Sequence, residues 1–143
     1  MAAPKNSAAI GVGLLGLAAV LIYNKLFPGP PDPRNGPAGI VDPAKDDARP
    51  ATFTTAQAAG LANAFYAAIY AGFFNEDEEV MRHILLQCQV TNDVKLLINA
   101  YGTRSTVATM ALDLPGAVAA YMPVDMILGV NLKYAQRAIN YRF

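Results

Sequence analysis

The order of apolar and polar residues divides the chain into three parts. Residues 8–22 carry no charged side chain, and the apolar character continues to Phe27. From Ser7, a residue type that suits a helix N-cap, to Phe27 an α-helix would be about 31 Å long. That length matches the hydrocarbon core of a bilayer, which is about 30 Å thick. Residues 1–27 are therefore predicted to form a single transmembrane anchor.

The side chains of this first part fit an anchor. The residues expected to contact lipid or the membrane interface are Ile10, Leu14, Leu17, Leu21, Tyr23, Lys25 and Phe27. Pro28 is expected to end the helix. A cleavable signal peptide is the rival interpretation, but only Lys5 precedes the apolar run as a charged side chain, and no small-x-small cleavage site follows it. Ala9, Gly13 and Gly16 leave self-association of the helix, and hence a homo-oligomer, as an alternative.

The second part is rich in proline. Residues 28–50 contain seven of the ten prolines, together with glycine and mixed charges, and show no apolar period. Such a composition favours an extended chain that buries no core. We therefore expect a Pro-rich linker that reaches about 70 Å when fully extended.

The third part, residues 51–143, has the 3.6-residue apolar period of helices and no convincing strand alternation. Five helices are expected, at about 54–73, 75–89, 91–102, 113–122 and 123–139, with a loop at 103–112 and an extended tail at 140–143. Asn75 and Asp113 are the expected caps of the second and fourth helices. The prediction is an all-α fold with one N-terminal transmembrane helix, a Pro-rich linker and a compact bundle of about five helices.

The apolar period also predicts which side chains form the core. They are Ala58, Leu61, Ala62, Phe65, Ile69 and Phe73, then Val80, Met81, Ile84, Leu85 and Cys88, then Val94, Leu97, Ile98 and Tyr101, and last Ile127, Leu128, Leu132 and Ala135. Residues 51–75 contain no charged side chain, which leaves a second membrane crossing as an alternative to a core helix.

Composition narrows the range of functions. Hydrophobic residues make up 54% of the chain and charged residues only 15%, below the usual quarter, as expected where lipid or a protein assembly covers part of the surface. The formal net charge is zero, so we expect no nucleic-acid partner. Cys88 is the only cysteine, which excludes an intrachain disulfide and a multi-cysteine metal site, and no cofactor is expected.

The densest group of reactive side chains surrounds the predicted start of the second helix. Four acidic residues, 76–79, precede His83, and Glu79 and His83 lie four residues apart on one helical face. The pair could hold a metal, but two ligands do not make a site, and a capped helix start with a carboxylate-imidazole pair in solvent is the favoured explanation, so no metal site is predicted. Cys88 is expected to be buried and unreactive. No catalytic residue is predicted, although a membrane-tethered cell-wall hydrolase acting through Glu76 or Glu79 stays open as an alternative.

Two stretches resemble known families. Residues 72–85, Gly-Phe-Phe-Asn-Glu-Asp-Glu-Glu-Val-Met-Arg-His-Ile-Leu, followed by Thr-Asn-Asp-Val-Lys-Leu-Leu-Ile-Asn-Ala-Tyr-Gly at 91–102, resemble the front of an annexin repeat. Asp113-Leu-Pro-Gly corresponds to the acidic residue that opens the next annexin helix. The resemblance implies a helical hairpin. Annexin calcium loops have a glycine-rich turn where this chain has Phe73-Phe74, so no calcium ligand is carried over.

The same hairpin, with residues 96–104 and the terminal Asn140-Tyr-Arg-Phe, is also similar to small helical domains in structural proteins of phages infecting Bacteroidetes. Some of those phages contain an internal membrane. This resemblance implies a structural role in a lipid-containing virion.

Together these observations predict a single-pass, membrane-anchored structural or scaffolding protein. It would link the lipid bilayer to a capsid-like or envelope protein layer, in a virion internal membrane or a bacterial inner membrane. Tyr121, Tyr134, Tyr141 and Phe143 are considered as aromatic contacts with the protein layer. For Tyr121 and Tyr134 a place in the domain's own core is the favoured alternative. Tyr141 and Phe143 are therefore the candidate partner contacts and are expected to be exposed. A bacterial envelope protein of the same build is the alternative.

Overall fold

The computed structural model describes residues 36, 38–45, 47–70, 77–106 and 111–143. All of them belong to one compact unit, Pro33–Phe143, which we call the helical domain. The predicted anchor, residues 1–27, lies outside the described residues. In the part of the chain that is described, no helix is long and apolar enough to cross a bilayer.

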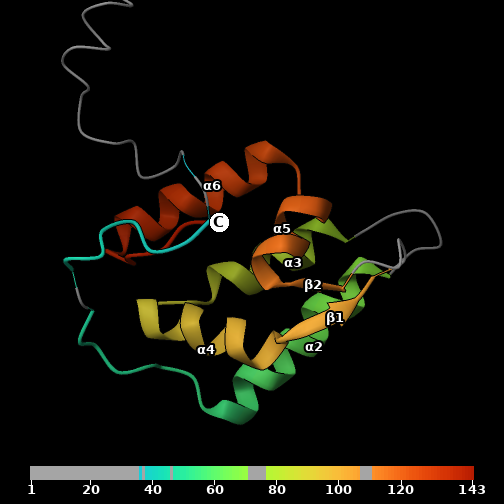
Figure 1. Cartoon of the computed structure of the whole chain (residues 1–143), viewed down its shortest axis with the longest axis horizontal. Helices are drawn as coiled ribbons and strands as arrows, with labels where there is room; N and C mark the ends of the chain where they lie inside the picture. Colours follow the sequence, from blue (N-terminus) through green and yellow to red (C-terminus); the bar gives the residue numbers. More distant parts are fainter. Residues whose placement is uncertain (1–35, 37, 46, 71–76, 107–110) are drawn as a thin grey trace, which may run out of the picture. The chain divides into compact units, whose positions relative to one another are not determined.

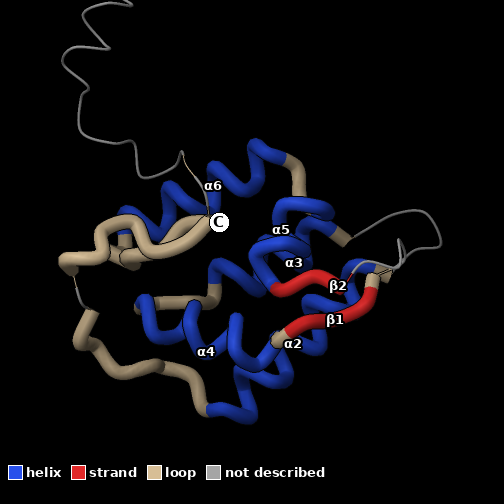
Figure 2. The backbone as a smooth tube through the Cα atoms, in the orientation of Figure 1, coloured by secondary structure: helices blue, strands red, loops and turns tan. Residues whose placement is uncertain are grey.

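The helical domain contains five helices and one short hairpin among the described residues (Figures 1 and 2). The elements are α2 (Thr55–Ile69), α3 (Glu78–Leu86), α4 (Thr91–Tyr101), β1 (Thr103–Ser105), β2 (Ala111–Asp113), α5 (Leu114–Tyr121) and α6 (Val124–Gln136). Helix α2 packs against α3 and α4, α3 packs against α6, and α4 contacts α5. The predicted helical bundle is therefore confirmed.

Helix boundaries follow local capping chemistry. The Thr54 hydroxyl accepts the Gln57 amide, and the Gln57 side chain accepts the Thr54 amide, which closes a capping box at α2. Asp113 caps α5 as predicted, through a 2.9 Å bond from the Gly116 amide. Asn75 was the expected cap of α3, but Asp77 accepts the Val80 amide in that role, and α3 begins at Glu78.

Two predictions about secondary structure need correction. The expected loop at 103–112 contains an antiparallel hairpin, in which Thr103 pairs with Asp113 and Ser105 with Ala111. Three-residue strands are too short to show alternation in the sequence. Helix α6 ends at Gln136 rather than near Ile139, because Ala138 has the left-handed φ of 54° and turns the chain back.

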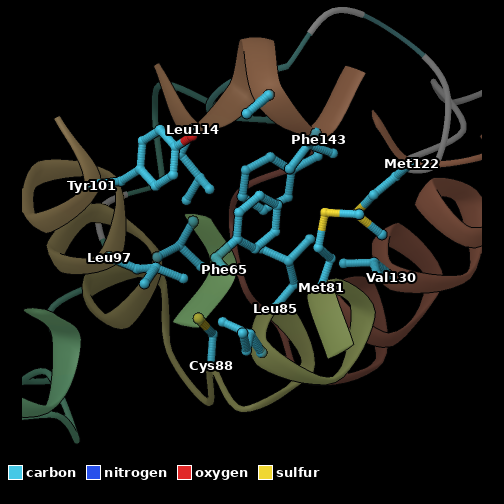
Figure 3. Packing of buried hydrophobic residues seen from close by; sticks show 14 of the residues in the cluster. Phe65, Met81, Leu85, Cys88, Leu97, Tyr101, Leu114, Met122, Val130 and Phe143 are labelled. Carbon is cyan, nitrogen blue, oxygen red and sulfur yellow. The ribbon is translucent and has the colours of Figure 1, made fainter. Parts of the chain in front are cut away.

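The core lies between all five helices. Figure 3 shows Phe65 of α2, Met81 and Leu85 of α3, and Leu97 of α4 in the same cluster. The predicted core residues Ala58, Ala62, Phe65, Ile69, Met81, Ile84, Leu85, Cys88, Val94, Leu97 and Tyr101 are all buried. Phe73 lies outside the described residues. Helix α2 has 15 residues and a core-facing side, fewer than the roughly 17–25 that a membrane crossing needs, so a second crossing here is not supported.

The core-facing side of α6 differs from the prediction. Leu132 was expected inside but is 41% exposed, whereas Val130, Asn131 and Tyr134 are buried. The sequence pattern misled because α6 carries apolar residues on two faces, and the buried face includes a polar asparagine.

The C-terminal tail is also part of the core. Tyr141 and Phe143 are only 8% and 7% exposed, so their expected exposure is wrong. The Asn131 side chain holds the tail: it donates to the Phe143 carbonyl at 2.8 Å and accepts the Phe143 amide at 2.9 Å. Figure 3 shows Phe143 among the other core residues. Tyr134 is fully buried, and its hydroxyl donates to the Leu85 carbonyl.

Candidate functional site

The second half of the predicted linker is attached to the helical domain. Gly39 and Arg142 exchange two backbone hydrogen bonds, of 2.8 and 3.0 Å. The Asn140 amide group donates to the Asp42 and Lys45 carbonyls, both at 2.7 Å, and its oxygen accepts the Asp42 amide. Figure 2 shows the two loop segments side by side. Residues 39–45, which the sequence analysis places in the linker, are therefore hydrogen-bonded to the C-terminal segment of the helical domain.

A cluster of polar side chains fastens this segment to the N-terminus of α4. We call it the α4 clasp, and it consists of Asp47, Arg49, Thr91, Asp93 and Asn140. The Asp47 carboxylate accepts the Thr91 amide at 3.0 Å and the Arg49 guanidinium in two bonds of 2.7 Å. Arg49 also donates to the Ala138 carbonyl at 2.9 Å. The Thr91 hydroxyl accepts a hydrogen bond from the Asn140 backbone amide. The 47–49 segment, the start of α4 and the C-terminal segment therefore meet at one helix end.

Asp93 is the buried centre of the α4 clasp. Its side chain is fully buried and accepts five hydrogen bonds: from the Thr52 amide and hydroxyl and from the amides of Phe53, Gln89 and Val90. A buried carboxylate without donors would be strongly destabilising, whereas this one is satisfied and lies in the first turn of a helix. The carboxylate thereby joins the start of α2, the α3–α4 connection and the start of α4.

The two carboxyl groups of the α4 clasp are held in their ionised form. At Asp47 the hydrogen bonds from the Arg49 side chain outweigh burial and, with the Thr91 amide, lower the pKa. At Asp93 burial opposes ionisation, but the bonds from Gln89, Thr52 and Phe53 outweigh it and the pKa is lowered. Neither carboxyl is suited to donate a proton near neutral pH, because a general acid needs a raised pKa.

Shallow hollows flank the α4 clasp. One, of about 440 Å³, is lined by Ile40, Pro43, Lys45, Asp47, Thr91, Lys95 and Asn140. A second, of about 320 Å³, is also lined by Lys45 and Asn140, together with Asn131 and Tyr141. Their polar groups are largely those that already hold the 39–50 segment in place. We interpret the α4 clasp as an attachment site within the chain.

The structure does not bring the predicted reactive groups together within the described residues. Glu79 pairs with Arg82 at 3.0 Å rather than with His83, which is exposed. Glu76 lies outside the described residues. Within the ranges that the structure describes, no three His, Cys, Asp or Glu side chains are placed to hold a metal ion.

Cys88 is buried, as predicted. Burial raises the pKa of its thiol to about 12, so the group is a thiol rather than a thiolate near neutral pH. Arg137 donates to the Cys88 carbonyl at 2.8 Å and also to the Leu86 carbonyl, which ties the end of α3 to the end of α6. These contacts give Cys88 a structural position.

A group of tyrosine and arginine side chains that the sequence analysis did not predict holds the hairpin to the C-terminal end of α2. Tyr66 and Tyr70 both donate to the Ser105 carbonyl, at 2.6 and 2.9 Å. The Arg104 guanidinium lies 5.2 Å from the Tyr66 ring centroid and 4.9 Å from that of Tyr101. The 66–70 spacing of four residues on one helix face was the available signal, but its partner strand was not predicted.

Comparison with protein-family models, curated proteins and solved structures finds no match for this chain.

Proposed function

We propose that this protein is a membrane-anchored structural protein that links a bilayer to a protein layer, as in a lipid-containing virion. Residues 1–27 would be the anchor, and the helical domain would contact the layer. The apolar run at 8–27 supports the first role, since its length and composition suit a bilayer.

The observation that carries the proposal is the attachment of the 39–50 segment. Because Gly39 is paired with Arg142 and Asp47 with Thr91, only eleven residues of sequence, 28–38, separate the apolar run from the first of these pairings. Eleven extended residues span about 34 Å, half the reach expected for the whole Pro-rich segment. A short tether suits a protein that keeps a domain close to a membrane.

The anchor is tested by liposome flotation of the full chain. We expect wild-type protein to float with the vesicles and to resist extraction by high salt and by alkaline carbonate. Leu14→Lys together with Leu17→Lys should abolish flotation, because a charge near a bilayer centre costs about 2.5–3.5 kcal/mol per residue. Leu132→Lys, on the exposed side of α6, is the matched control and should float normally. Release of the wild-type chain by salt alone would contradict the anchor.

The link to a protein layer is tested in the native source. Detergent extraction followed by chemical cross-linking and mass spectrometry should recover a capsid-like or envelope protein joined to lysines of the helical domain. Recovery of the chain cross-linked only to itself would contradict the linking role. Cleavage of peptidoglycan by the purified full chain would instead support the hydrolase alternative.

A further inference from the structure

Helix α6 has two apolar faces, and only one is used by the fold. Its inner face buries Val130 and Tyr134 in the core. Its outer face carries Val124, which is 72% exposed, and Leu132, which is 41% exposed. Leu128 lies between them in the row of every fourth residue and does not belong to the residues packed on the core cluster. Figure 1 shows α6 along one edge of the helical domain. The outer face therefore carries two exposed apolar side chains with the half-buried Leu128 between them.

A second row of every fourth residue runs beside the first. It consists of Asp125, Gly129 and Lys133, and all three are exposed. No ion pair joins Asp125 or Lys133 to another side chain within the described parts of the chain. A Cβ added to Gly129 would meet nothing within 4 Å, so the middle of this row is open. The row has an acid at one end, a base at the other and the smallest residue at its centre.

This arrangement is self-complementary. Asp125 and Lys133 lie four residues on either side of Gly129, about 6 Å along the helix axis in each direction. In an antiparallel pair of α6 helices with a two-fold axis at Gly129, each Asp125 faces Lys133 of the other copy. A parallel pair would place like charges opposite each other. Gly129 lets two backbones approach closely, and the row of Val124, Leu128 and Leu132 then covers its counterpart.

We propose that the outer face of α6 is a self-association surface, on which two copies of this chain pair as antiparallel helices about a two-fold axis at Gly129. Closed two-fold dimers use the same patch on both copies, which is the property that the charge pattern has. The contact spans one helix of 13 residues, about 20 Å, and so belongs to the small interfaces that form at high local concentration. The inference is independent of the proposed function.

Charge exchange tests the pairing directly. The full chain is purified in detergent, and its self-association is measured by sedimentation. Asp125→Lys places Lys against Lys in the pair, and Lys133→Asp places Asp against Asp, so each variant alone should dimerise at least about tenfold more weakly than wild type. An equimolar mixture of the two variants restores both opposite-charge contacts and should associate to within about threefold of wild type.

Recovery of dimerisation in the mixture distinguishes pairing of two copies from binding of another molecule to the same surface. A monomeric wild-type chain, or variants that associate as wild type does, would overturn the proposal. Weakening that mixing does not restore would also overturn it, because the two charges would then contact lipid, another protein or another part of the chain. Self-association through residues 1–27 is unaffected by these exchanges.

A glycine substitution tests the close approach. Gly129→Leu adds a side chain where the domain has open space and replaces glycine with a better helix former, so the domain should stay folded. It should weaken dimerisation at least about tenfold, because the two helices can no longer meet at this point. Gly60→Leu is the matched control: Gly60 lies in α2 with equally open space and should leave dimerisation unchanged. Normal pairing of the Gly129→Leu chain, with its thermal unfolding intact, would contradict the geometry.

Discussion

Charged side chains at the N-terminus of α4 and on the outer face of α6 lie in opposite environments. At α4, Asp93 is fully buried, and five donors from its own chain satisfy it. On α6, Asp125 and Lys133 are exposed and stand beside uncovered apolar side chains. A buried charge requires partners because water is excluded, whereas an exposed charge keeps its hydration. The first region therefore stabilises the fold, and the second is free to meet another molecule.

The largest expected effect comes from breaking the centre of the α4 clasp. Asp93→Ala removes the acceptor for five donors, four of them backbone amides, and leaves the buried Val90 amide and four partly buried donors without this partner. We expect the free energy of unfolding to fall by about 3–5 kcal/mol, as measured by chemical denaturation of the full chain in detergent.

Asp77→Asn is the control for this substitution. Asp77 is an exposed cap, and asparagine caps a helix about as well as aspartate, so its effect should be below about 0.5 kcal/mol. Equal effects of Asp93→Ala and Asp77→Asn would mean that the α4 clasp contributes nothing special to stability.

Asn140→Ala should have the next largest effect. The Asn140 side chain makes three hydrogen bonds to the 42–45 segment, so its loss should cost about 2–3 kcal/mol and loosen that segment. Hydrogen exchange of the Gly39 and Asp42 amides should accelerate, while exchange in α4 should change less. Unchanged protection of both amides would show that the segment is held by other contacts.

Acid should weaken the α4 clasp. The folded-state pKa values of Asp47 and Asp93 lie below the ordinary aspartate value of about 3.9. Their stabilisation is therefore complete above about pH 4 and is lost as the pH falls below it towards the folded-state values. The melting temperature of the full chain should drop over this range, and Asp47→Asn should make the drop smaller. Identical acid profiles for the two proteins would exclude Asp47 as a contributor.

Apart from the Asp77→Asn control, the smallest expected effect on stability lies on the outer face of α6. Leu132→Ala removes a side chain that is 41% exposed and should change the stability of the domain by less than about 1 kcal/mol. Leu97→Ala, the same change in the core, should cost about 2–5 kcal/mol. A comparable loss of stability for both substitutions would mean that Leu132 is packed as tightly as Leu97. The outer face of α6 would then not differ from the core.

Elements with a strong local signal were predictable. The apolar period with threonine, aspartate or glycine at its ends located α2, α4 and α5 within a few residues, because caps and the 3.6-residue repeat are local properties. Most buried positions of α2, α3 and α4 followed from the same repeat, but Val80 of α3, also expected in the core, is 40% exposed. On α6 the predicted core-facing side was wrong. This helix has apolar residues on two faces, so the repeat alone does not show which face is buried, and only the packing of the domain selects one.

What sequence alone determined, then, is the helical class of the domain, most helix ends and the apolar run at 8–27. Tertiary structure alone decided that the 39–45 segment is bound to the C-terminal segment and that the tail belongs to the core. The bonds from Asn140 to the 42–45 segment join residues 95 and 98 positions apart, and no local pattern reports such a partner. Likewise, Tyr141 and Phe143 look like a free aromatic tail until Asn131 and the reversal at Ala138 return them to the core. A hydrogen bond between residues far apart in the sequence forms where the fold brings a donor and an acceptor together away from water. Only the tertiary structure shows which groups meet in this way.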